Sequence, residues 1–337
     1  MQMKNWLIST LLLTSLSVTA SNLDTTRADL IVALQTQIAK NYVDVNKVEH
    51  INNSLTMLSP EVYSHLSDEK FIALITKTLE KHDAHFSFQE KPDQTKKQPA
   101  MESWFSRLSR SNSGFNSVEN LKGGVGYIDF WGFDSVNDKS RKRVSAVMQL
   151  VSDSQAIIID LRNNGGGSAE MVQLISSYFL DGKVHLNSFY SRPSDSRTDF
   201  WTYADIPAIF KQDVPVYILT SKKTFSAAEE FAYNFKHLKR ATLIGEKTKG
   251  GANPWQWFEV GASHRVAVPI SMAINPITQT NWEGVGVQPD INTIADSAFD
   301  IAYQKALLDI KSKTKNPFLS DEINIELSKL EEKQQQL

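Results

Sequence analysis

One serine, placed where a predicted strand gives way to a predicted helix, has the surroundings that a nucleophile needs. Residues 213–238 read DVPVYILTSKKTFSAAEEFAYNFKHL. The apolar run Val216–Leu219 predicts a buried strand, and apolar residues spaced by three and four after Ser226 predict an amphipathic helix. Ser226 then lies at the positive end of the helix dipole, among backbone N–H groups that have no partner inside the helix. Such groups can stabilise an oxyanion beside the serine hydroxyl.

The same residues also fit a purely structural role. Ser226-Ala-Ala-Glu229 has the S-x-x-E pattern of a capping box, which begins many helices without any chemistry. Serine is among the commonest residues at this position of a helix. On these residues alone, capping is therefore the commoner explanation, and the rest of the chain has to decide between the two.

A glycine-rich segment, Asn163–Ser168, follows the predicted buried strand 156–160 and precedes a predicted helix over 169–180. Its glycines, among them Gly165 and Gly166, let the backbone approach a ligand closely and direct N–H groups inward, as half of an oxyanion hole requires. Phosphate binding is a rival interpretation, although the segment lacks the GxGxxG spacing and the GK[ST] ending. A plain tight turn is the third interpretation.

A serine nucleophile needs a base. His82 and His85 lie where the helical period changes to the alternation of a strand. A desolvated lysine could serve instead, but the four lysines near the serine, Lys222, Lys223, Lys247 and Lys249, lie in polar turns.

A late carboxylate could complete the site. Glu283, between a tryptophan and two glycines, could orient the base as the third member of a triad, or could be an ordinary solvated turn residue. The sequence contains no HExxH and no His–carboxylate cluster at ligand spacing, so it predicts neither a metal site nor a cofactor.

Composition narrows the function classes. The chain has 337 residues, 41% hydrophobic and 22% charged, with a net charge of −2, which is typical of a globular protein and does not favour nucleic-acid binding. The absence of cysteine excludes disulfides and a cysteine nucleophile.

Lys4, the apolar run 6–16 and the small residues 18–20 predict a signal peptide over residues 1–20. We therefore expect a soluble protein that is periplasmic or secreted.

The pattern of the chain predicts four parts after the signal peptide. Residues 21–90 read as an N-terminal helical domain of three helices, 91–120 as a linker, 121–312 as an α/β core and 313–337 as a tail with one exposed helix. In the core, strands alternate with helices up to about residue 250. Strands are then expected over 255–260, 265–269 and 282–287 without helices between them.

Five segments resemble, in order, the core motifs of the tail-specific (C-terminal processing) serine peptidase family, S41. They are GYIDF (126–130), IDLRNNGGG (159–167), TFSAAEEFA (224–232), RATLIGE (240–246) and WEGVGVQPD (282–290). The resemblance covers about residues 25–310 and is closest to the branch that contains the repeats of interphotoreceptor retinoid-binding protein. That branch shares Asn41-Tyr42, Ser113-Gly-Phe115 and Ser177-Tyr-Phe179.

The resemblance implies an α/β fold with a crotonase/ClpP-like ββα-spiral core and a helical cap domain. It also implies that Ser226 is the nucleophile, with an oxyanion hole formed by the N–H groups of Ala227 and of Gly165 or Gly166. Two features depart from the lysine-dependent members of the family. The position of their lysine is Gly251 here, and residues 91–120 are too few for the PDZ module that they usually carry.

The related tricorn-like branch uses a histidine from before the core and a late glutamate in place of the lysine. His85 and Glu283 match these two positions. The resemblance thus implies His85 as the general base and Glu283 as its support.

Taken together, the sequence predicts an exported serine peptidase that acts on a peptide or protein substrate without a cofactor or a metal. The main alternative is a weakly catalytic or non-catalytic binding protein for a hydrophobic ligand, retinoid-like or lipid-like. Its pocket would be lined by some of the aromatic residues Phe225, Phe231, Trp255, Trp257 and Trp282. A hydrolase of small esters or amides is a third possibility. The sequence does not predict the oligomeric state.

Overall fold

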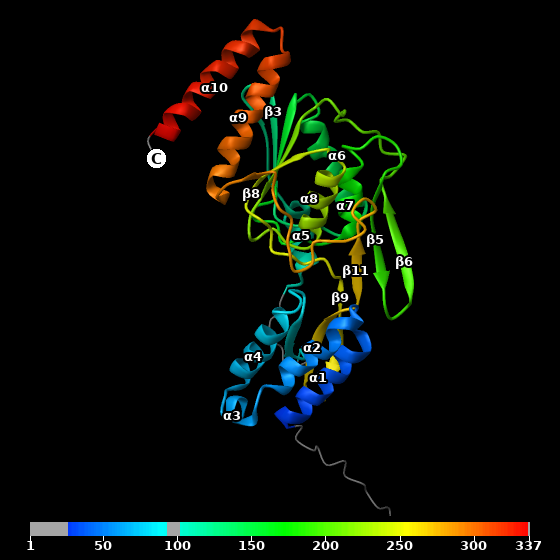
Figure 1. Ribbon diagram of the computed structural model, residues 1–337. Coiled ribbons are helices and arrows are strands. Elements are labelled where there is room, and N and C mark those ends of the chain that lie inside the picture. The colour runs from blue at the N-terminus through cyan, green and yellow to red at the C-terminus, as the bar shows by residue number, and fades with distance from the viewer. Residues whose placement is uncertain (1–25, 93–101, 336–337) are drawn as a thin grey trace, which may run out of the picture.

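The computed structural model describes residues 26–92 and 102–335, so the predicted signal peptide lies outside the described part of the chain (Figure 1). Its N-terminal part is helical, as predicted, with one short helix more than expected. The helices are α1 (Arg27–Asn41), α2 (Val45–Thr56), α3 (Pro60–Tyr63) and α4 (Asp68–Glu80). Side chains of Thr26, Asp44 and Ser67 cap the starts of α1, α2 and α4, which is why these helices begin where they do.

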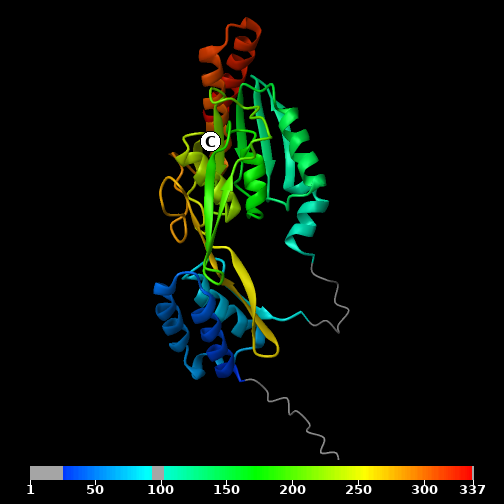
Figure 2. The same ribbon diagram turned by 90° about the vertical axis from the view of Figure 1, so that its right-hand side faces the viewer.

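The helical part is completed by strands from the other end of the chain. A three-stranded antiparallel sheet has the order β1-β10-β9, with β1 (Ser87–Glu90), β10 (His264–Pro269) and β9 (Trp255–Val260). Phe86 and Phe88 share one apolar core with Val266 and with residues of α1, α2 and α4. Figures 1 and 2 both show β9 beside the N-terminal helices. Strands from the C-terminal half therefore help to build the N-terminal domain. The segment between α4 and β1 is fixed both by the N-terminal helices and by these strands.

The main sheet has six strands in the order β12-β8-β7-β4-β3-β2. They are β2 (Phe115–Leu121), β3 (Val125–Phe130), β4 (Ala156–Asp160), β7 (Val216–Thr220), β8 (Thr242–Gly245) and β12 (Ile291–Asn292). All neighbouring pairs are parallel except β2 with β3. The strands β4 and β7 are buried throughout, as expected for central strands of a parallel sheet.

Helices cover both faces of this sheet (Figure 1). One face packs against α6 (Asp138–Leu150), α7 (Ala169–Ser176) and α8 (Ala227–His237), and the other against α9 (Ala295–Lys313), on which α10 (Pro317–Gln335) packs in turn. Because side chains alternate along a strand, Ile157 and Ile159 belong to the first core and Ile158 to the second. The predicted tail helix is thus a packed helix, with Ile323 fully buried.

Three further differences from the sequence analysis concern short elements. Residues 104–110 form α5 (Trp104–Arg110), followed by the 3₁₀ turn η1 (Asn112–Gly114) and by β2, so much of the predicted linker is folded. Residues 282–287 form turns instead of a strand. A second antiparallel sheet, β11-β5-β6, was not anticipated; it contains β5 (His185–Ser191), β6 (Ser196–Trp201) and β11 (Ser271–Ile274). Its strands carry many polar residues, which hid the alternation.

The parallel pairing of β4 with β7 brings two predicted site segments together. Both strands end at the same edge of the sheet, so the glycine-rich segment after β4 meets the turn after β7. A Cβ added to Gly166 would lie 2.8 Å from the Cβ of Ser226 and 3.0 Å from the Ala227 nitrogen. The two segments therefore touch, and only glycine fits at this contact.

Candidate active site

Ser226 occupies a strained turn between β7 and α8. Its φ is 55° and its ψ −121°, a conformation that residues other than glycine rarely adopt. Such strain costs about 1–3 kcal/mol and persists only where the surrounding structure over-determines it. The turn directs the serine hydroxyl to the imidazole of His85, whose Nε2 lies 3.1 Å from Ser226 Oγ. Ser226 is thus more than the start of a helix.

The carboxylate of Glu229 holds this turn in place. Its two oxygens accept hydrogen bonds from the backbone N–H groups of Ser226 (2.9 Å), Gly250 (2.6 Å) and Gly251 (2.8 Å), and from the hydroxyl of Thr248. Burial raises the pKa of Glu229 to about 7, although these donors act to lower it. The capping-box pattern pointed to the first of these bonds. No local pattern pointed to the other three, because residues 248–251 contact α8 only in the folded chain.

His85 reaches the serine from the segment between α4 and β1. Its side chain is only 5% exposed, and its ring packs against Phe225 with 4.6 Å between ring centroids. The other histidine considered from the sequence, His82, faces away and lies 3.1 Å from the hydroxyl of Ser54. Of the two, the structure brings His85 to Ser226.

Asp83, which the sequence analysis did not single out, lies behind His85. Its Oδ1 accepts the backbone N–H of His85 at 3.0 Å and lies 3.7 Å from the ring nitrogen Nδ1. Its Oδ2 accepts hydrogen bonds from Tyr42 at 3.3 Å and from Asn253 at 2.8 Å. The spacing Asp-x-His was visible in the sequence, but its importance depends on Tyr42 and Asn253, which come from distant segments.

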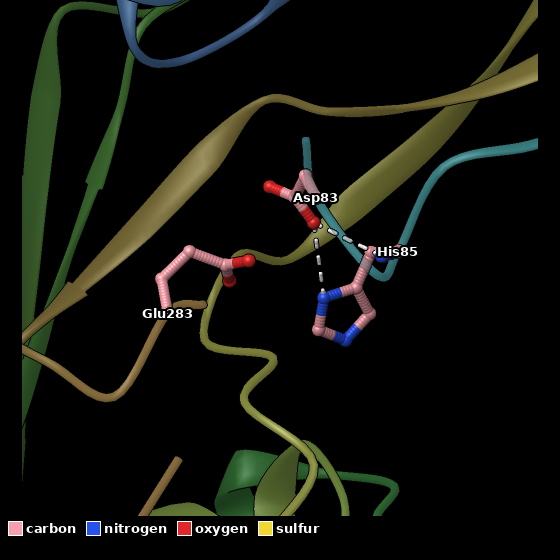
Figure 3. Close-up of side chains that lie close together, drawn as sticks. All are labelled: Asp83, His85 and Glu283. Carbon is pink, nitrogen blue, oxygen red and sulfur yellow. Dashed lines mark hydrogen bonds and ion pairs between the residues drawn. The ribbon is translucent and has the colours of Figure 1, made fainter. Parts of the chain in front are cut away.

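Glu283 also reaches this cluster (Figure 3). One carboxylate oxygen accepts the Ala252 N–H at 2.6 Å, and the other is buried without a hydrogen-bond partner among the described residues. Burial, with the negative charge of Asp83 nearby, raises the pKa of Glu283 to about 8. Asp83, His85 and Glu283 each place one potential ligand atom within 4.8 Å of the other two. The fold thus assembles a His–carboxylate cluster that the sequence analysis, limited to local spacing, did not find.

Gly251, the position that matches the lysine of the lysine-dependent relatives, has no room for a side chain. A Cβ there would lie 2.2 Å from the Phe225 ring and 2.8 Å from His85 Cε1. The imidazole and the Phe225 ring thus occupy the space that a lysine would need. Lys249 is close, but its ammonium lies over the Phe225 ring, 4.4 Å from the ring centroid.

The predicted oxyanion-hole groups are in different states. The Ala227 N–H, at the start of α8, donates to no other described residue. The Gly165 N–H donates to the Trp131 carbonyl at 3.1 Å, and the Gly166 N–H donates to the Asn164 side chain at 2.9 Å. One donor is therefore ready, whereas Gly165 or Gly166 can act as the second only after it is released from its hydrogen bond to Trp131 or to Asn164.

The aromatic residues considered for a hydrophobic ligand do not form one pocket. Phe231 and Trp282 are buried in the main core, and Trp255 and Trp257 pair with each other on β9. Surface cavities of about 540 and 300 Å³ lie elsewhere, near the start of β7 and beside β2. No helix in the described ranges is both long and apolar enough to cross a membrane.

Comparison with known proteins places the chain in a family. Residues 124–293, just over half of the chain, match the sequence profile of peptidase family S41. The chain belongs to peptidase family S41. This confirms the family predicted from the motifs. The chain is 31% identical over 178 residues to carboxyl-terminal-processing peptidase 2, chloroplastic, of Arabidopsis thaliana. That match covers 53% of this S41 chain but only 32% of the Arabidopsis protein.

Solved structures of similar fold extend over more of the chain. A candidate peptidase from Parabacteroides merdae matches with a TM-score of 0.58 and 19% identity, over 83% of this chain and 92% of its own. The tricorn protease matches with a TM-score of 0.52 and 13% identity, over 90% of this chain and 37% of its own. At these identities the likeness concerns the fold, which is the mixed α/β fold of S41 peptidases.

Proposed function

We propose that this S41 family member is an active serine peptidase in which Ser226 is the nucleophile and His85 the general base. The observation that carries the proposal is the 3.1 Å contact between Ser226 Oγ and His85 Nε2 at the start of α8. On attack at the substrate carbonyl, His85 Nε2 takes the hydroxyl proton and later gives it to the leaving amine. The Ala227 N–H supports the oxyanion, with Gly165 or Gly166 as the second donor after the loop rearranges.

The relay behind the base involves two carboxylates. Asp83 is better placed than Glu283 to orient the imidazole, because its oxygen also holds the His85 backbone N–H. Glu283, in its ionised form, adds negative charge that stabilises the imidazolium formed during the reaction. We assign both residues to positioning and charge support rather than to direct contact with substrate.

Three finer assignments are part of the same proposal. The core is taken to be a crotonase/ClpP-like ββα spiral, the branch to be that of the retinoid-binding protein repeats, and the substrate to be a peptide or protein.

Export is also part of the proposal and rests on the pattern of residues 1–20. Its test is cell fractionation of the full chain, with N-terminal sequencing of the product. Mature protein beginning at Ser21 outside the cytoplasm supports export, and full-length protein in the cytoplasm contradicts it.

The serine is tested with a fluorophosphonate probe, which labels only activated serines. We expect stoichiometric labelling of the wild-type protein, no labelling of Ser226→Ala, and at least a hundredfold slower labelling of His85→Ala. His82→Ala is the matched control, because His82 follows the same helix but contacts Ser54. It should label at the wild-type rate.

Labelling that survives Ser226→Ala would reject the assignment of the nucleophile. Equal rates for His85→Ala and His82→Ala would reject that of the base. Hydrolysis assays with peptide libraries and with small esters, using protein that the probe labels, then distinguish a peptidase from an esterase. Turnover of esters alone would contradict the peptidase.

A further inference from the structure

The side of His85 that faces away from the serine contains unused hydrogen-bonding capacity. The Nδ1 atom of His85 is buried and has no hydrogen-bond partner among the described residues. The His85 side chain as a whole is only 5% exposed. One carboxylate oxygen of Glu283 is likewise buried and has no hydrogen-bond partner among the described residues. Buried polar atoms without partners are uncommon in native proteins, and each one calls for an explanation such as a bound ion.

These atoms converge on one point. Figure 3 shows Nδ1 of His85 directed at Asp83, and the carboxylate of Glu283 directed toward both. Because one ligand atom from each residue lies within 4.8 Å of the other two, some point lies within about 2.8 Å of all three. Zinc binds imidazole nitrogen and carboxylate oxygen at about 2.0–2.2 Å, so closing the site takes movements of less than about 1 Å.

The surroundings hold the carboxylates as metal ligands are usually held. Asp83 accepts hydrogen bonds from Tyr42 and Asn253, and Glu283 accepts one from the Ala252 N–H. Outer hydrogen bonds of this kind orient the ligands of a metal and leave other lone pairs free for it. The site is thus preorganised on two of its three sides.

Charge also favours a cation at this point. The side chain of Asp83 is fully buried, and Glu283 lies close enough for the two carboxylates to repel each other in a medium of low dielectric. A divalent cation neutralises both charges. A site with one imidazole and two carboxylates suits zinc and similar transition metals better than calcium or magnesium, which prefer oxygen alone.

We propose that Asp83, His85 Nδ1 and Glu283 bind a divalent transition-metal cation of the zinc type, and that this cation switches the serine off. The binding follows from the cluster itself, whereas the switching rests on the function proposed above. A metal on Nδ1 leaves the only ring proton on Nε2. Nε2 then donates to Ser226 Oγ and cannot take its proton, so the general base is lost. Any proton previously held by Nδ1 or by a carboxyl is released when the metal binds.

Binding is measured first, by calorimetric titration of Zn²⁺ into tag-free, metal-free mature protein. We expect one site per chain. Asp83→Asn and Glu283→Gln, which keep the side-chain shapes, should each weaken binding at least tenfold, and Ser226→Ala should leave it unchanged because the serine faces the other nitrogen. Asp199→Asn is the matched control: Asp199 lies 3.8 Å from a ring nitrogen of His185, but its own side chain is 44% exposed. That variant should bind as the wild type does.

Inhibition is measured next, as the rate of fluorophosphonate labelling with and without Zn²⁺. We expect Zn²⁺ to suppress labelling of the wild type at least tenfold, EDTA to restore it, and Glu283→Gln to resist suppression. No binding, or binding that Asp83→Asn and Glu283→Gln leave unchanged, overturns the proposal. Binding at the cluster without any effect on labelling overturns the switch alone. A wild-type protein that is never labelled refutes the proposed function, while the titration still decides the metal site.

Discussion

The two sides of Ser226 are built differently. On the backbone side, the Glu229 carboxylate accepts four hydrogen bonds and ties the strained serine to residues 248–251. On the imidazole side, His85 Nδ1 and one oxygen of Glu283 are buried without partners. The nucleophile is therefore fixed by a saturated network, whereas its activation depends on an unsaturated one. The position of the nucleophile is thus set when the chain folds, whereas its activation depends on the protonation of His85 and, under the proposal above, on a bound cation.

The largest effect is expected on the saturated side, from Glu229→Ala. It leaves three N–H groups without an acceptor, at about 1–3 kcal/mol for each group that stays buried, and removes the support of the strained φ of Ser226. We expect the unfolding free energy to fall by several kcal/mol and labelling of the serine to disappear. Denaturant unfolding and fluorophosphonate labelling measure the two effects.

The control for Glu229→Ala is Glu170→Ala. Glu170 lies in the first turn of the neighbouring helix α7 but is exposed. Its loss should change stability by no more than about 0.5 kcal/mol and leave labelling intact. If both variants behave alike, Glu229 is an ordinary cap and the backbone side is not a network.

A second prediction concerns the boundary between the two sides, at Gly251. Gly251→Ala places a methyl group 2.2 Å from the Phe225 ring and 2.8 Å from His85, so the imidazole must move. Because a misplacement of about 1 Å can cost about 100-fold in rate, we expect labelling to slow by about that factor. Gly251→Lys should not restore a lysine base, since Phe225 and His85 fill its place.

Relief of the crowding tests the physical reason. Adding Phe225→Leu to Gly251→Ala opens space beside the imidazole and should recover part of the labelling rate, a coupling that a double-mutant cycle measures. Additive losses in the double variant would show that the methyl group acts through something other than His85.

A third prediction divides the unsaturated side. With EDTA present, Asp83→Asn should slow labelling by about 100-fold and Glu283→Gln by about 10-fold. The reason is that Asp83 also holds the His85 backbone, whereas Glu283 is anchored only to the Ala252 N–H. Labelling rates at saturating probe decide it. The reverse order would make Glu283 the residue that orients the base.

Much of this arrangement could be predicted from the sequence. The apolar runs and helical periods located β4, β7, β9 and α8 within a residue or so, and the family motifs placed Ser226 and His85 in one site. Local patterns sufficed there because period and turn chemistry act over a few residues. The short strand expected over 282–287 was wrong, because its two glycines adopt positive φ and the segment turns.

The remaining features depend on contacts between distant segments. Asp83 acquires its role from Asn253, 170 residues later in the chain, and Glu229 from Gly250 and Gly251 across a loop. The crowding at Gly251 was equally invisible, although the missing lysine pointed to it. Such roles are set by contacts between segments that are distant in the chain, and no local spacing in the sequence reveals them.

The smallest effect expected is a pH dependence of stability on the saturated side. Burial raises the pKa of Glu229 to about 7, from 4.5 for the ordinary carboxyl. Between these values the folded protein holds a proton that the unfolded chain has released. The stabilisation is therefore complete below pH 4.5 and is lost as the pH rises to 7. Glu229→Gln cannot titrate, so the wild-type stability relative to this variant should fall by roughly 1–3 kcal/mol over that range. Thermal unfolding of both proteins at several pH values measures the difference. A relative stability that rises with pH would contradict the raised pKa. It would mean that the four hydrogen-bond donors lower the pKa of Glu229 by more than burial raises it, so that the carboxylate stays ionised.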